Sequence, residues 1–393
     1  MRIIKVVTVG RSDFGLYLPL LKQIALEDQI RCELIVSGAH LSPEFGMTVR
    51  AVEESGFPVC DRIEMLVSSD TPEAISKSMG LGTIGFAQAF ARSRPDILVL
   101  LGDRFEMHAA AVAALPFLIP VAHIAGGAVT AGAIDDAFRH SMTKMSHLHF
   151  VETGTYGDRL ARMGEEPWRI TISGSLSVDN VRDLELLSRP EFESRYAIPL
   201  SDPPLIVTFH PETRDYESTA VHCDELLGAL EDSRWPIVFT LPNADTNGRI
   251  IIRKIEAFAA KRERTYFVAN LGVLGYFSLM KHALAMVGNS SSGLMEAPSF
   301  CLPVVNIGRR QEGRFAQRNV IHVGHSRQEV RQGIETAVSS NFISGLKGMV
   351  NAYGDGHAAE RIVNVLRTVP LDQRLLVKSF HDIEEKTDVP ASG

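Results

Sequence analysis

The sequence predicts an α/β protein built from two Rossmann-like domains with a ligand cleft between them. Short apolar runs recur along the chain, and each ends in glycine and polar residues, as buried parallel strands do. Segments of helix-forming composition separate these runs, which gives the strand–helix–strand order of doubly wound sheets. With 393 residues the chain exceeds a typical single α/β core, so we expect two domains of similar size.

The central unit of this pattern is a strand, a helix and a second strand. We expect them at Ile97–Leu101, Met107–Phe117 and Ile119–Ile124. In open α/β sheets, ligands bind at the carboxyl ends of the strands. Polar residues follow both strands there, at Gly102–Arg104 and His123–Gly127. The chemistry is therefore expected at this edge.

The same pattern continues through the first half of the chain. A strand over residues 3–9 leads into a glycine-bracketed turn, Gly10–Gly15, and then into a helix over Leu18–Leu26. The other strands are expected at Cys32–Ser37, Asp61–Met65, His149–Val151 and Arg169–Ser175. The other helices are expected at Thr48–Ser55, Thr71–Arg92, Phe138–Met145 and Gly154–Met163.

A charged stretch with few apolar runs, from about Asp179 to Pro204, is the expected hinge. Strands resume after it, at Leu205–Phe209, Ile237–Leu241, Thr265–Val268, Ala285–Asn289 and Pro303–Ile307. A final helical pattern covers Ala358–Arg367. We place the domains at residues 1–180 and 181–365, with a C-terminal helix at about 366–380 packing back on the first domain. Residues 381–393 have the composition of a disordered tail.

Composition limits the classes of function. The net charge of -7 gives no electrostatic reason to expect nucleic acid or an anionic membrane as partner. The four cysteines lack metal-site spacing, so reduced structural thiols in a cytoplasmic protein are the favoured interpretation. No signal-peptide pattern opens the chain, and two prolines and a histidine interrupt the most apolar window, Ala109–Val129. We expect no membrane span.

Two strand-end features in the first half suggest anion binding. The turn at Gly10–Gly15 offers backbone N–H groups, and the Arg11 guanidinium is suited to clamp a phosphate. The turn is not the G-x-G-x-x-G fingerprint, so a purely structural turn is equally compatible. His40 follows the second strand in the same layer, although a lone histidine there is more often structural.

The turn Gly288–Gly293 in the second half is the more specific signal. Its hydroxyls and N–H groups converge on a strand-to-helix turn, which makes a phosphate cradle without a lysine. Glu296, one turn into the expected helix, is suited to bind ribose hydroxyls, and Arg310 to balance a diphosphate. A serine-rich N-cap with a solvated glutamate is the alternative. The P-loop, dinucleotide and Gly-x-Ser-x-Gly patterns are all absent, so nothing indicates ATP hydrolysis, NAD binding or α/β-hydrolase chemistry.

Carboxylates gather in the stretch from Ile97 to His140, which contains the central unit and the residues after it. Asp103 and Asp135 are suited to moving protons on a sugar beside a diphosphate. For Asp135 and Asp136 the alternative is N-capping of the helix that follows. The same stretch holds Arg104, His123 and Arg139, and His210 is expected to face them from the second half.

Long motifs run nearly from one end of the chain to the other. They are GRSDFGL, GAHLSPEFGMT, LGDRFE, GAIDDAFRHSMTKMSHLHF, MGEEPWRI, the His210-Pro211 pair, PNAD, GNSSSGLMEAPSF, PVVNIGRRQEGR and YGDG. With them the chain resembles the hydrolysing UDP-N-acetylglucosamine 2-epimerases, in the branch of sialic-acid and legionaminic-acid pathway enzymes.

The resemblance implies a glycosyltransferase-B type fold that closes on UDP, in a homodimer or homotetramer without metal or nicotinamide. It also implies elimination of UDP to a 2-acetamidoglucal, and then addition of water to give free N-acetylmannosamine. Asp103 and Asp135 match the family's carboxylates, and the resemblance places Arg104 beside the sugar and His210 near the diphosphate. The implied substrate contacts are Arg11, Gly15, His40, Asn243, Ser290, Ser291, Glu296 and Arg310.

Three alanines depart from the family pattern. Relatives carry glutamate or histidine in place of Ala125, and acidic residues in place of Ala128 and Ala131. A methyl group transfers no proton. The chain is therefore an epimerase for another sugar, a low-activity enzyme, or a UDP-sugar-binding relative. The legionaminic-type branch, which its longest motif most resembles, acts on a 2,4-diacetamido-2,4,6-trideoxy UDP-sugar. A non-hydrolysing epimerase and, by fold analogy alone, a glycosyltransferase are further rivals.

Overall fold

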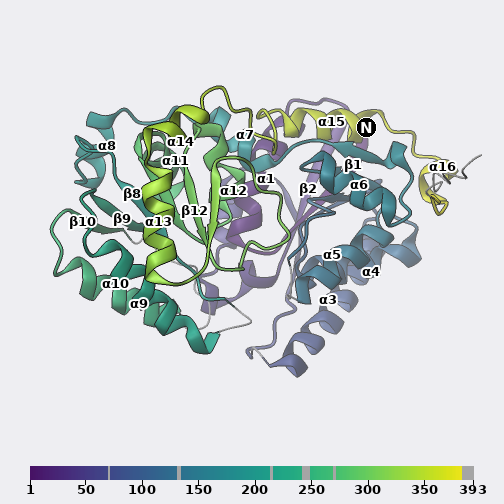
Figure 1. The fold of residues 1–393 in the computed structure, drawn as a ribbon. Coiled ribbons are helices and arrows are strands. Elements are labelled where there is room, and N and C mark those ends of the chain that lie inside the picture. Colours follow the sequence, from purple (N-terminus) through teal and green to yellow (C-terminus); the bar gives the residue numbers. More distant parts are fainter. Residues whose placement is uncertain (70, 131–133, 213–215, 241–247, 269–270, 383–393) are drawn as a thin grey trace, which may run out of the picture. The chain divides into compact units, whose positions relative to one another are not determined.

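The computed structural model describes residues 1–69, 71–130, 134–212, 216–240, 248–268 and 271–382. The chain divides into two compact units (Figure 1). Unit 1 comprises Met1–Ala128, Ile134–Leu176 and His357–Gly393, and unit 2 comprises Val129–Ala133 and Ser177–Gly356. Each unit contains one sheet of parallel strands with helices, which confirms the predicted α/β class with two Rossmann-like domains.

Unit 1 has a seven-stranded sheet in the order β3-β2-β1-β4-β5-β6-β7. The strands are β1 (Arg2–Thr8), β2 (Ile30–Ser37), β3 (Val59–Ile63), β4 (Ile97–Leu101), β5 (Val121–Ile124), β6 (Leu148–Val151) and β7 (Ile170–Ile172). All paired strands run parallel. The central strands are mostly apolar, as expected of a parallel sheet, although β1 also buries Lys5 and Thr8. Ile4 of β1 pairs with Cys32 of β2 and with Ile97 of β4, so the strand order reverses between β1 and β4.

The helices of unit 1 follow the predicted pattern with two corrections. They are α1 (Arg11–Ile24), α2 (Val49–Glu54), α3 (Pro72–Arg92), α4 (Phe105–Ala114), α5 (Ile134–Met145), α6 (Gly154–Arg162), α15 (Ala358–Thr368) and α16 (Gln373–Leu376). The expected open turn at Gly10–Gly15 is wrong, because α1 begins directly at Arg11. A helix at about 366–380 is also wrong. Pro370 holds the preceding residue, Val369, in an extended conformation, which ends α15.

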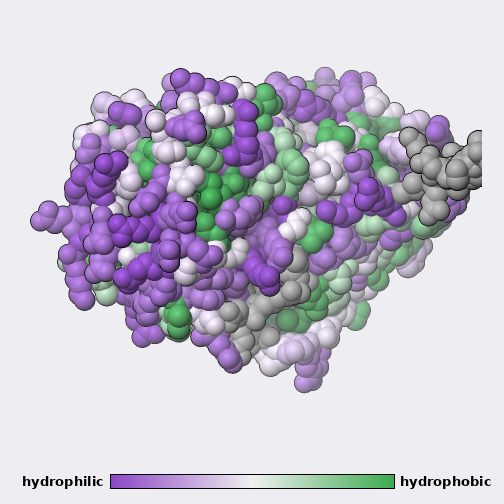
Figure 2. All heavy atoms as spheres, viewed as in Figure 1, coloured by the Kyte–Doolittle hydropathy of each residue, from purple (hydrophilic) through white to green (hydrophobic). Residues whose placement is uncertain are grey.

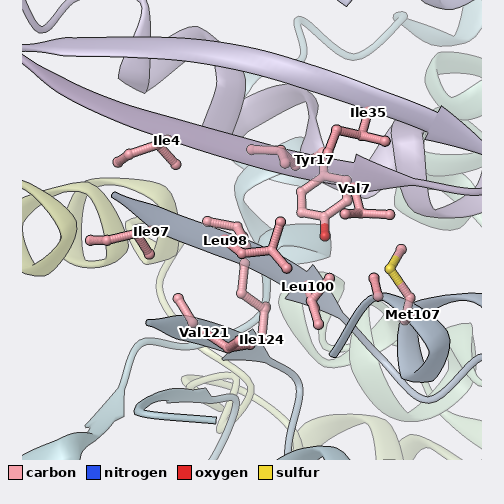
Figure 3. Close-up of a cluster of buried hydrophobic side chains, with 14 of the residues drawn as sticks. Ile4, Val7, Tyr17, Ile35, Ile97, Leu98, Leu100, Met107, Val121 and Ile124 are labelled. Atoms are coloured by element: carbon pink, nitrogen blue, oxygen red, sulfur yellow. The ribbon is translucent and has the colours of Figure 1, made fainter. Parts of the chain in front are cut away.

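A continuous apolar core fixes the strands of unit 1. Figure 3 shows side chains of β1, β2, β4 and β5 packed together with Tyr17 of α1 and Met107 of α4. The labelled residues are almost completely buried. Because the core holds the strands rigidly, their carboxyl ends and the loops that follow have defined positions.

Buried charges fasten the C-terminal segment to unit 1. The Glu165 carboxylate, with a side chain that is 0% exposed, accepts hydrogen bonds from Lys144 Nζ at 2.7 Å and His149 Nε2 at 2.9 Å. Lys378 Nζ lies 2.6 Å from the same carboxylate. Arg169 is buried and donates to the carbonyl groups of Arg374, Leu375 and Val377. An ion pair and a set of hydrogen bonds therefore hold the segment after α15, in addition to the packing of Leu375 in the apolar core.

Unit 2 has a six-stranded parallel sheet in the order β10-β9-β8-β11-β12-β13. Its strands are β8 (Leu205–Thr208), β9 (Ile237–Thr240), β10 (Thr265–Val268), β11 (Ala285–Gly288), β12 (Val304–Ile307) and β13 (Val320–Val323). The edge strand β13 was not predicted. Gly288 has φ +134°, and a Cβ there would lie 1.9 Å from the Thr208 carbonyl oxygen. Only glycine fits at this point of β11.

The helices of unit 2 are α7 (Leu176–Asp183), α8 (Arg189–Tyr196), α9 (Thr219–Leu230), α10 (Gly248–Ala259), α11 (Gly272–His282), α12 (Ser292–Met295), α13 (Arg327–Ala337) and α14 (Ser340–Gly345). The expected hinge therefore contains α7 and α8, and a capping box between Ser188 and Glu191 starts the second of them. Polar residues cover most of the face shown in Figure 2. No helix within the described ranges is long and apolar enough to cross a bilayer.

Candidate functional site

The site residues follow the strands at which each sheet reverses its order. In unit 1 the reversal lies between β1 and β4, and in unit 2 it lies between β8 and β11. Loops diverge at such points and leave room for a ligand at the carboxyl edge. Arg11 follows β1 and Asp103 follows β4, while His210 follows β8 and Ser290 follows β11. Each sheet thus presents candidate residues at the expected edge.

Two carboxylates and a buried arginine form the centre of this edge in unit 1. Asp103 follows β4, Asp135 lies in the first turn of α5, and Arg139 lies one turn later in α5. Arg139 is 5% exposed and forms an ion pair with Asp103. Burial, and then the charge of Asp103, raise the pKa of Asp135. The structure therefore brings the two predicted carboxylates together, about a guanidinium that holds Asp103 in place.

The neighbouring Asp136 has a different role. Its carboxylate lies 4.0 Å from Arg139 Nη1 and 3.5 Å from His140 Nε2, on the same helix. These are i,i+3 and i,i+4 pairs within α5. Asp136 therefore braces Arg139 and the helix that carries it.

Arg104 is held by a carboxylate that the sequence did not single out. Its Nε and Nη2 atoms donate to the two oxygens of Glu106, at 3.2 and 2.9 Å. The Glu106 side chain is 0% exposed, whereas that of Arg104 is 44% exposed. This two-point contact fixes the guanidinium plane and leaves part of it open to a ligand.

A chain of buried polar groups connects the ends of β1 and β2. Asp13 of α1 accepts hydrogen bonds from the Val9 N–H at 2.9 Å and the Thr8 hydroxyl at 2.8 Å. His40 Nε2 lies 2.9 Å from the same hydroxyl, and its Nδ1 lies 2.7 Å from Thr48 Oγ1. Burial lowers the pKa of His40 to about 4, so the ring is neutral at pH 7. With both nitrogens engaged, His40 supports the strand ends, and its predicted substrate contact stays a prediction.

Asp13 should make the stability of the fold depend on pH. Burial raises the pKa of its carboxyl from 3.8 to about 6, against the hydrogen bonds from Val9 and Thr8. Its contribution to stability is therefore complete below pH 3.8 and is lost as the pH rises through about 6. Asp13→Asn removes this loss. The free energy of unfolding of the variant minus that of wild type should therefore be more favourable to the variant by about 1 kcal/mol at pH 7 than at pH 5.

Urea unfolding at the two pH values measures this difference. The exposed aspartate Asp28, replaced by asparagine, is the matched control and should give the same difference from wild type at both. If the Asp13 and Asp28 variants show the same change in free energy of unfolding between the two pH values, the prediction that the buried Asp13 carboxyl titrates in this range is wrong.

His123 and the alanines after it are structural in unit 1. His123 Nε2 lies 2.8 Å from the Gly102 carbonyl oxygen, so the ring ties the end of β5 to the end of β4. Burial lowers its pKa to about 3. Ala125 has φ +64°, in the left-handed region that alanine rarely adopts, and Ala128 is 7% exposed. The described part of this loop therefore carries methyl groups at Ala125 and Ala128, which cannot transfer a proton.

Asn289 organises the corresponding edge of unit 2. This side chain is completely buried, and it exchanges two hydrogen bonds with the backbone of His210, at 2.7 and 2.9 Å. The backbone carbonyl oxygen of Asn289 accepts hydrogen bonds from Arg310 Nη1 at 3.1 Å and from Gln311 Nε2 at 2.8 Å. The loops after β8, β11 and β12 are thus tied together at one residue. The structure brings His210, Ser290 and Arg310 to this point.

His210 is a neutral group beside a cation. Burial, and then the positive charge of Arg310, lower its pKa to about 3. Next to it, Glu212 accepts from the Arg309 backbone N–H at 2.9 Å and lies 3.2 Å from His325 Nε2. Glu212 therefore joins the loop after β8 to the loop that carries Arg310.

The serine-rich turn differs from the predicted phosphate cradle in one respect. The helix after it, α12, has only four residues, so Glu296 lies at its C-terminal end and not one turn into a long helix. Ser290 and Ser291 precede it, and Ser290 Oγ accepts a weak bond from the Ser292 N–H at 3.4 Å. Tyr276 of α11, which the sequence did not single out, joins this group. Burial raises its pKa to about 12, although hydrogen bonds with hydroxyls of the turn oppose the shift.

The remaining predicted residues are placed as follows. Arg11 is exposed at the first position of α1, and Gly15 lies inside the same helix with open space where a Cβ would be. Asn243 and Ala131 lie outside the described residues. Among the residues that the structure describes, no three His, Cys, Asp or Glu side chains are arranged to hold a metal ion.

Known proteins resemble the chain over nearly its whole length. The family model described as UDP-N-acetylglucosamine 2-epimerase matches residues 22–367. The GDP/UDP-N,N'-diacetylbacillosamine 2-epimerase (hydrolyzing) of Campylobacter jejuni is 37% identical over 385 residues, which cover 97% of this chain and 99% of that protein. The UDP-N,N'-diacetylbacillosamine 2-epimerase (hydrolyzing) of Legionella pneumophila is 32% identical over 372 residues, or 95% and 97% of the two chains.

A solved structure supports the fold. The UDP-GlcNAc 2-epimerase of Neisseria meningitidis, bound to UDP-GlcNAc, superposes with a TM-score of 0.77 at 17% identity. The alignment covers 93% of this chain and 99% of that one. At this identity the likeness concerns the fold alone.

Proposed function

This chain belongs to the UDP-N-acetylglucosamine 2-epimerase family, and we propose that it is a hydrolysing epimerase of 2-acetamido UDP-sugars. Its substrate is UDP-N-acetylglucosamine or a close relative with the same 2-acetamido group. The products are UDP and the free sugar with inverted configuration at C2. Membership of the family and the hydrolysing relatives both support this reaction.

The reaction has two balanced steps. In the first, a base removes the hydrogen at C2 while the bond between C1 and the UDP oxygen breaks with its electron pair, leaving UDP and a 2-acetamidoglucal. In the second, water adds across the double bond. Its oxygen bonds to C1, and a proton bonds to C2 on the face opposite to the one that lost the hydrogen. The C2 hydrogen is weakly acidic, so the site must position a carboxylate well and stabilise the leaving diphosphate.

The Asp103 and Asp135 pair is the observation that carries this proposal. Two carboxyl groups with different environments can divide the work of acid and base. Asp103 is ion-paired with Arg139, whereas burial and the charge of Asp103 raise the pKa of Asp135. We assign proton transfer to these two groups, and Arg104 to the sugar beside them.

The diphosphate is assigned to unit 2. Arg310 supplies a positive charge next to neutral His210, and Ser290 and Ser291 supply hydroxyls. His210 then acts as a hydrogen-bond donor and not as a cation, since its pKa of about 3 lies far below neutral pH. Glu296 and Asn243 are assigned to the nucleoside, and Arg11, Gly15 and His40 to the first-domain side of the substrate.

Replacing Arg310 by alanine should weaken UDP binding about 10- to 100-fold, because a charge-assisted contact to the diphosphate is lost. Calorimetric titration with UDP measures the affinity. Arg309→Ala is the matched control, since this neighbouring side chain is 84% exposed and only its backbone contacts Glu212. Equal loss of affinity in both variants would contradict the role of Arg310.

The alanines at 125 and 128 favour a second candidate function, a UDP-sugar-binding protein without turnover. It predicts binding of UDP-sugars at micromolar protein concentration with no UDP released. The test is to incubate the chain with UDP-N-acetylglucosamine and, separately, its 2,4-diacetamido-2,4,6-trideoxy counterpart, and to separate the products. Free 2-epimer with equimolar UDP supports hydrolysing epimerisation. A UDP-linked 2-epimer identifies a non-hydrolysing enzyme, and unchanged substrate identifies a binding protein.

A further inference from the structure

A cavity of about 930 Å³ opens at the carboxyl edge of unit 1, beside Arg104 and Glu106. This volume lies in the range of small-molecule sites, about 300–1,000 Å³. Its walls come from the loop Gly38–Met47, which follows β2, and the loop Glu64–Ser69, which follows β3. The cavity therefore extends from the candidate sugar site towards the β3 edge of the sheet.

Apolar side chains form much of the lining. Phe45 is 58% exposed and Val67 is 37% exposed, and both line the cavity, so they offer apolar surface to an occupant. Met65 is 2% exposed and lies over α3, where a Cβ on Gly82 would come within 2.6 Å of its methyl carbon. Leu41, Leu66 and Ile75 complete the apolar part.

Hydrogen bonds hold both loops in place. The Ser42 carbonyl oxygen accepts from the Phe45 N–H at 3.2 Å and from the Met47 N–H at 3.1 Å. In the other loop, the Val67 N–H donates to Ser78 Oγ at 3.0 Å, which anchors it to α3. A wall already held in this way loses little freedom when a ligand binds.

The charges of the cavity exclude an anionic occupant. Glu44, Glu64 and Glu106 line it, and the guanidinium of Arg104 is already paired with Glu106 at 2.9 Å. A phosphate or carboxylate would meet excess negative charge here. An uncharged ligand with methyl groups finds apolar contacts, and an amide finds hydroxyl groups of Ser42 and Ser69.

We infer that this cavity receives the substituents at C4 and C6 of the substrate sugar, and that it selects a 4-acetamido, 6-deoxy sugar over N-acetylglucosamine. This assignment rests on the proposed function. An acetamido methyl and a C6 methyl gain contacts with Phe45 and Val67, whereas the hydroxyls of N-acetylglucosamine lose water against the same wall. The relatives that act on diacetylbacillosamine nucleotides agree with this choice of sugar.

Variants of the cavity wall test the inference through the selectivity between two substrates. We measure kcat/KM for UDP-2,4-diacetamido-2,4,6-trideoxyglucose and for UDP-N-acetylglucosamine. Phe45→Ala should lower the first value about tenfold and the second less than about twofold, since one lost apolar contact typically costs about 10- to 200-fold in discrimination. Val67→Thr keeps the shape but adds a hydroxyl, and should lower the selectivity in the same direction. Ile84→Ala is the matched control, because Ile84 is also 58% exposed but lies outside the lining.

A wild-type preference for UDP-N-acetylglucosamine, or equal losses for both sugars in Phe45→Ala, would overturn the inference while leaving the proposed reaction intact. Thermal unfolding of each variant shows whether the fold is retained. Where wild type turns over neither sugar, the proposed function fails, and calorimetric affinities for the same two UDP-sugars decide about the cavity. If wild type binds the 2,4-diacetamido UDP-sugar more tightly than UDP-N-acetylglucosamine and Phe45→Ala removes this preference, the role of the cavity is upheld. If wild type binds both sugars equally, or if the variant keeps the preference, that role is overturned.

Discussion

Asp103→Asn is expected to reduce kcat at least about 100-fold, the usual scale of one positioned acid or base. Asparagine keeps the shape and one hydrogen bond to Arg139, so the geometry of the loop after β4 is preserved. It cannot take up or release a proton in the reaction. The affinity for UDP should stay within about threefold, because the residues that we propose to bind the diphosphate belong to unit 2 and are unchanged.

The measurement is UDP release under saturating substrate, together with calorimetric binding of UDP. Asp158→Asn, at an exposed aspartate of α6, is the control and should retain full turnover. Near-normal turnover in Asp103→Asn would remove this residue from the catalytic assignment. A parallel loss of UDP affinity would show that the substitution had disturbed more than proton transfer.

Glu165→Gln should lower the free energy of unfolding by about 3 kcal/mol, because it removes the buried charge that compensates Lys144 and Lys378. Urea unfolding measures the loss. Glu73→Gln is the control, since Glu73 pairs with Lys77 on the surface of α3 with both side chains mainly exposed. That pair is expected to contribute less than about 0.5 kcal/mol. A loss no larger than that of the control would contradict the ionic fastening of the C-terminal segment.

The same carboxylate predicts a weakening of the fold in acid. Burial alone would raise the pKa of Glu165, but hydrogen bonds from His149, Lys144 and Lys378 outweigh it and bring the pKa to about 2. Because the folded value lies below the unfolded value of 4.5, the stabilisation is complete above pH 4.5 and is lost as the pH falls towards 2. Wild type should therefore lose more stability than Glu165→Gln between pH 5 and pH 3, as followed by urea unfolding.

Most strands were predictable from the sequence because each is a short apolar run that ends in glycine or polar residues. Ile97–Leu101 was placed correctly to the residue. By contrast, β13 is an edge strand with His322 in its middle, and α8 is short and polar. Neither shows the spacing of apolar residues that is typical of a strand or a helix. The C-terminal segment belongs to unit 1 as expected, but the helix at about 366–380 was wrong because α15 ends before Pro370. The contacts of Glu165 and Arg169 that hold this segment could not be predicted, since they join residues far apart in the sequence.

The candidate site was predictable where its residues follow strand ends, but not where long-range hydrogen bonds hold those residues in place. Asp103, Asp135, His210 and Arg310 all follow strands or begin helices at the expected edges. Asn289 was predicted only to end a strand and begin a turn, yet its side chain binds the backbone of His210, which lies 79 positions away. Glu106 and Asp13 were missed for the same reason, since their partners become visible only in the fold. The homo-oligomer and the substrate roles of Arg11 and Gly15 stay predictions.

A hydrolysing 2-epimerase removes and replaces the hydrogen at C2 while it releases UDP. Proton NMR of the reaction in deuterated water tests this directly, with the two UDP-sugars offered separately. We expect a free 2-epimer in which deuterium occupies C2, and one equivalent of UDP. Release of UDP with hydrogen retained at C2 and the configuration unchanged would contradict it, because such a product requires only simple hydrolysis.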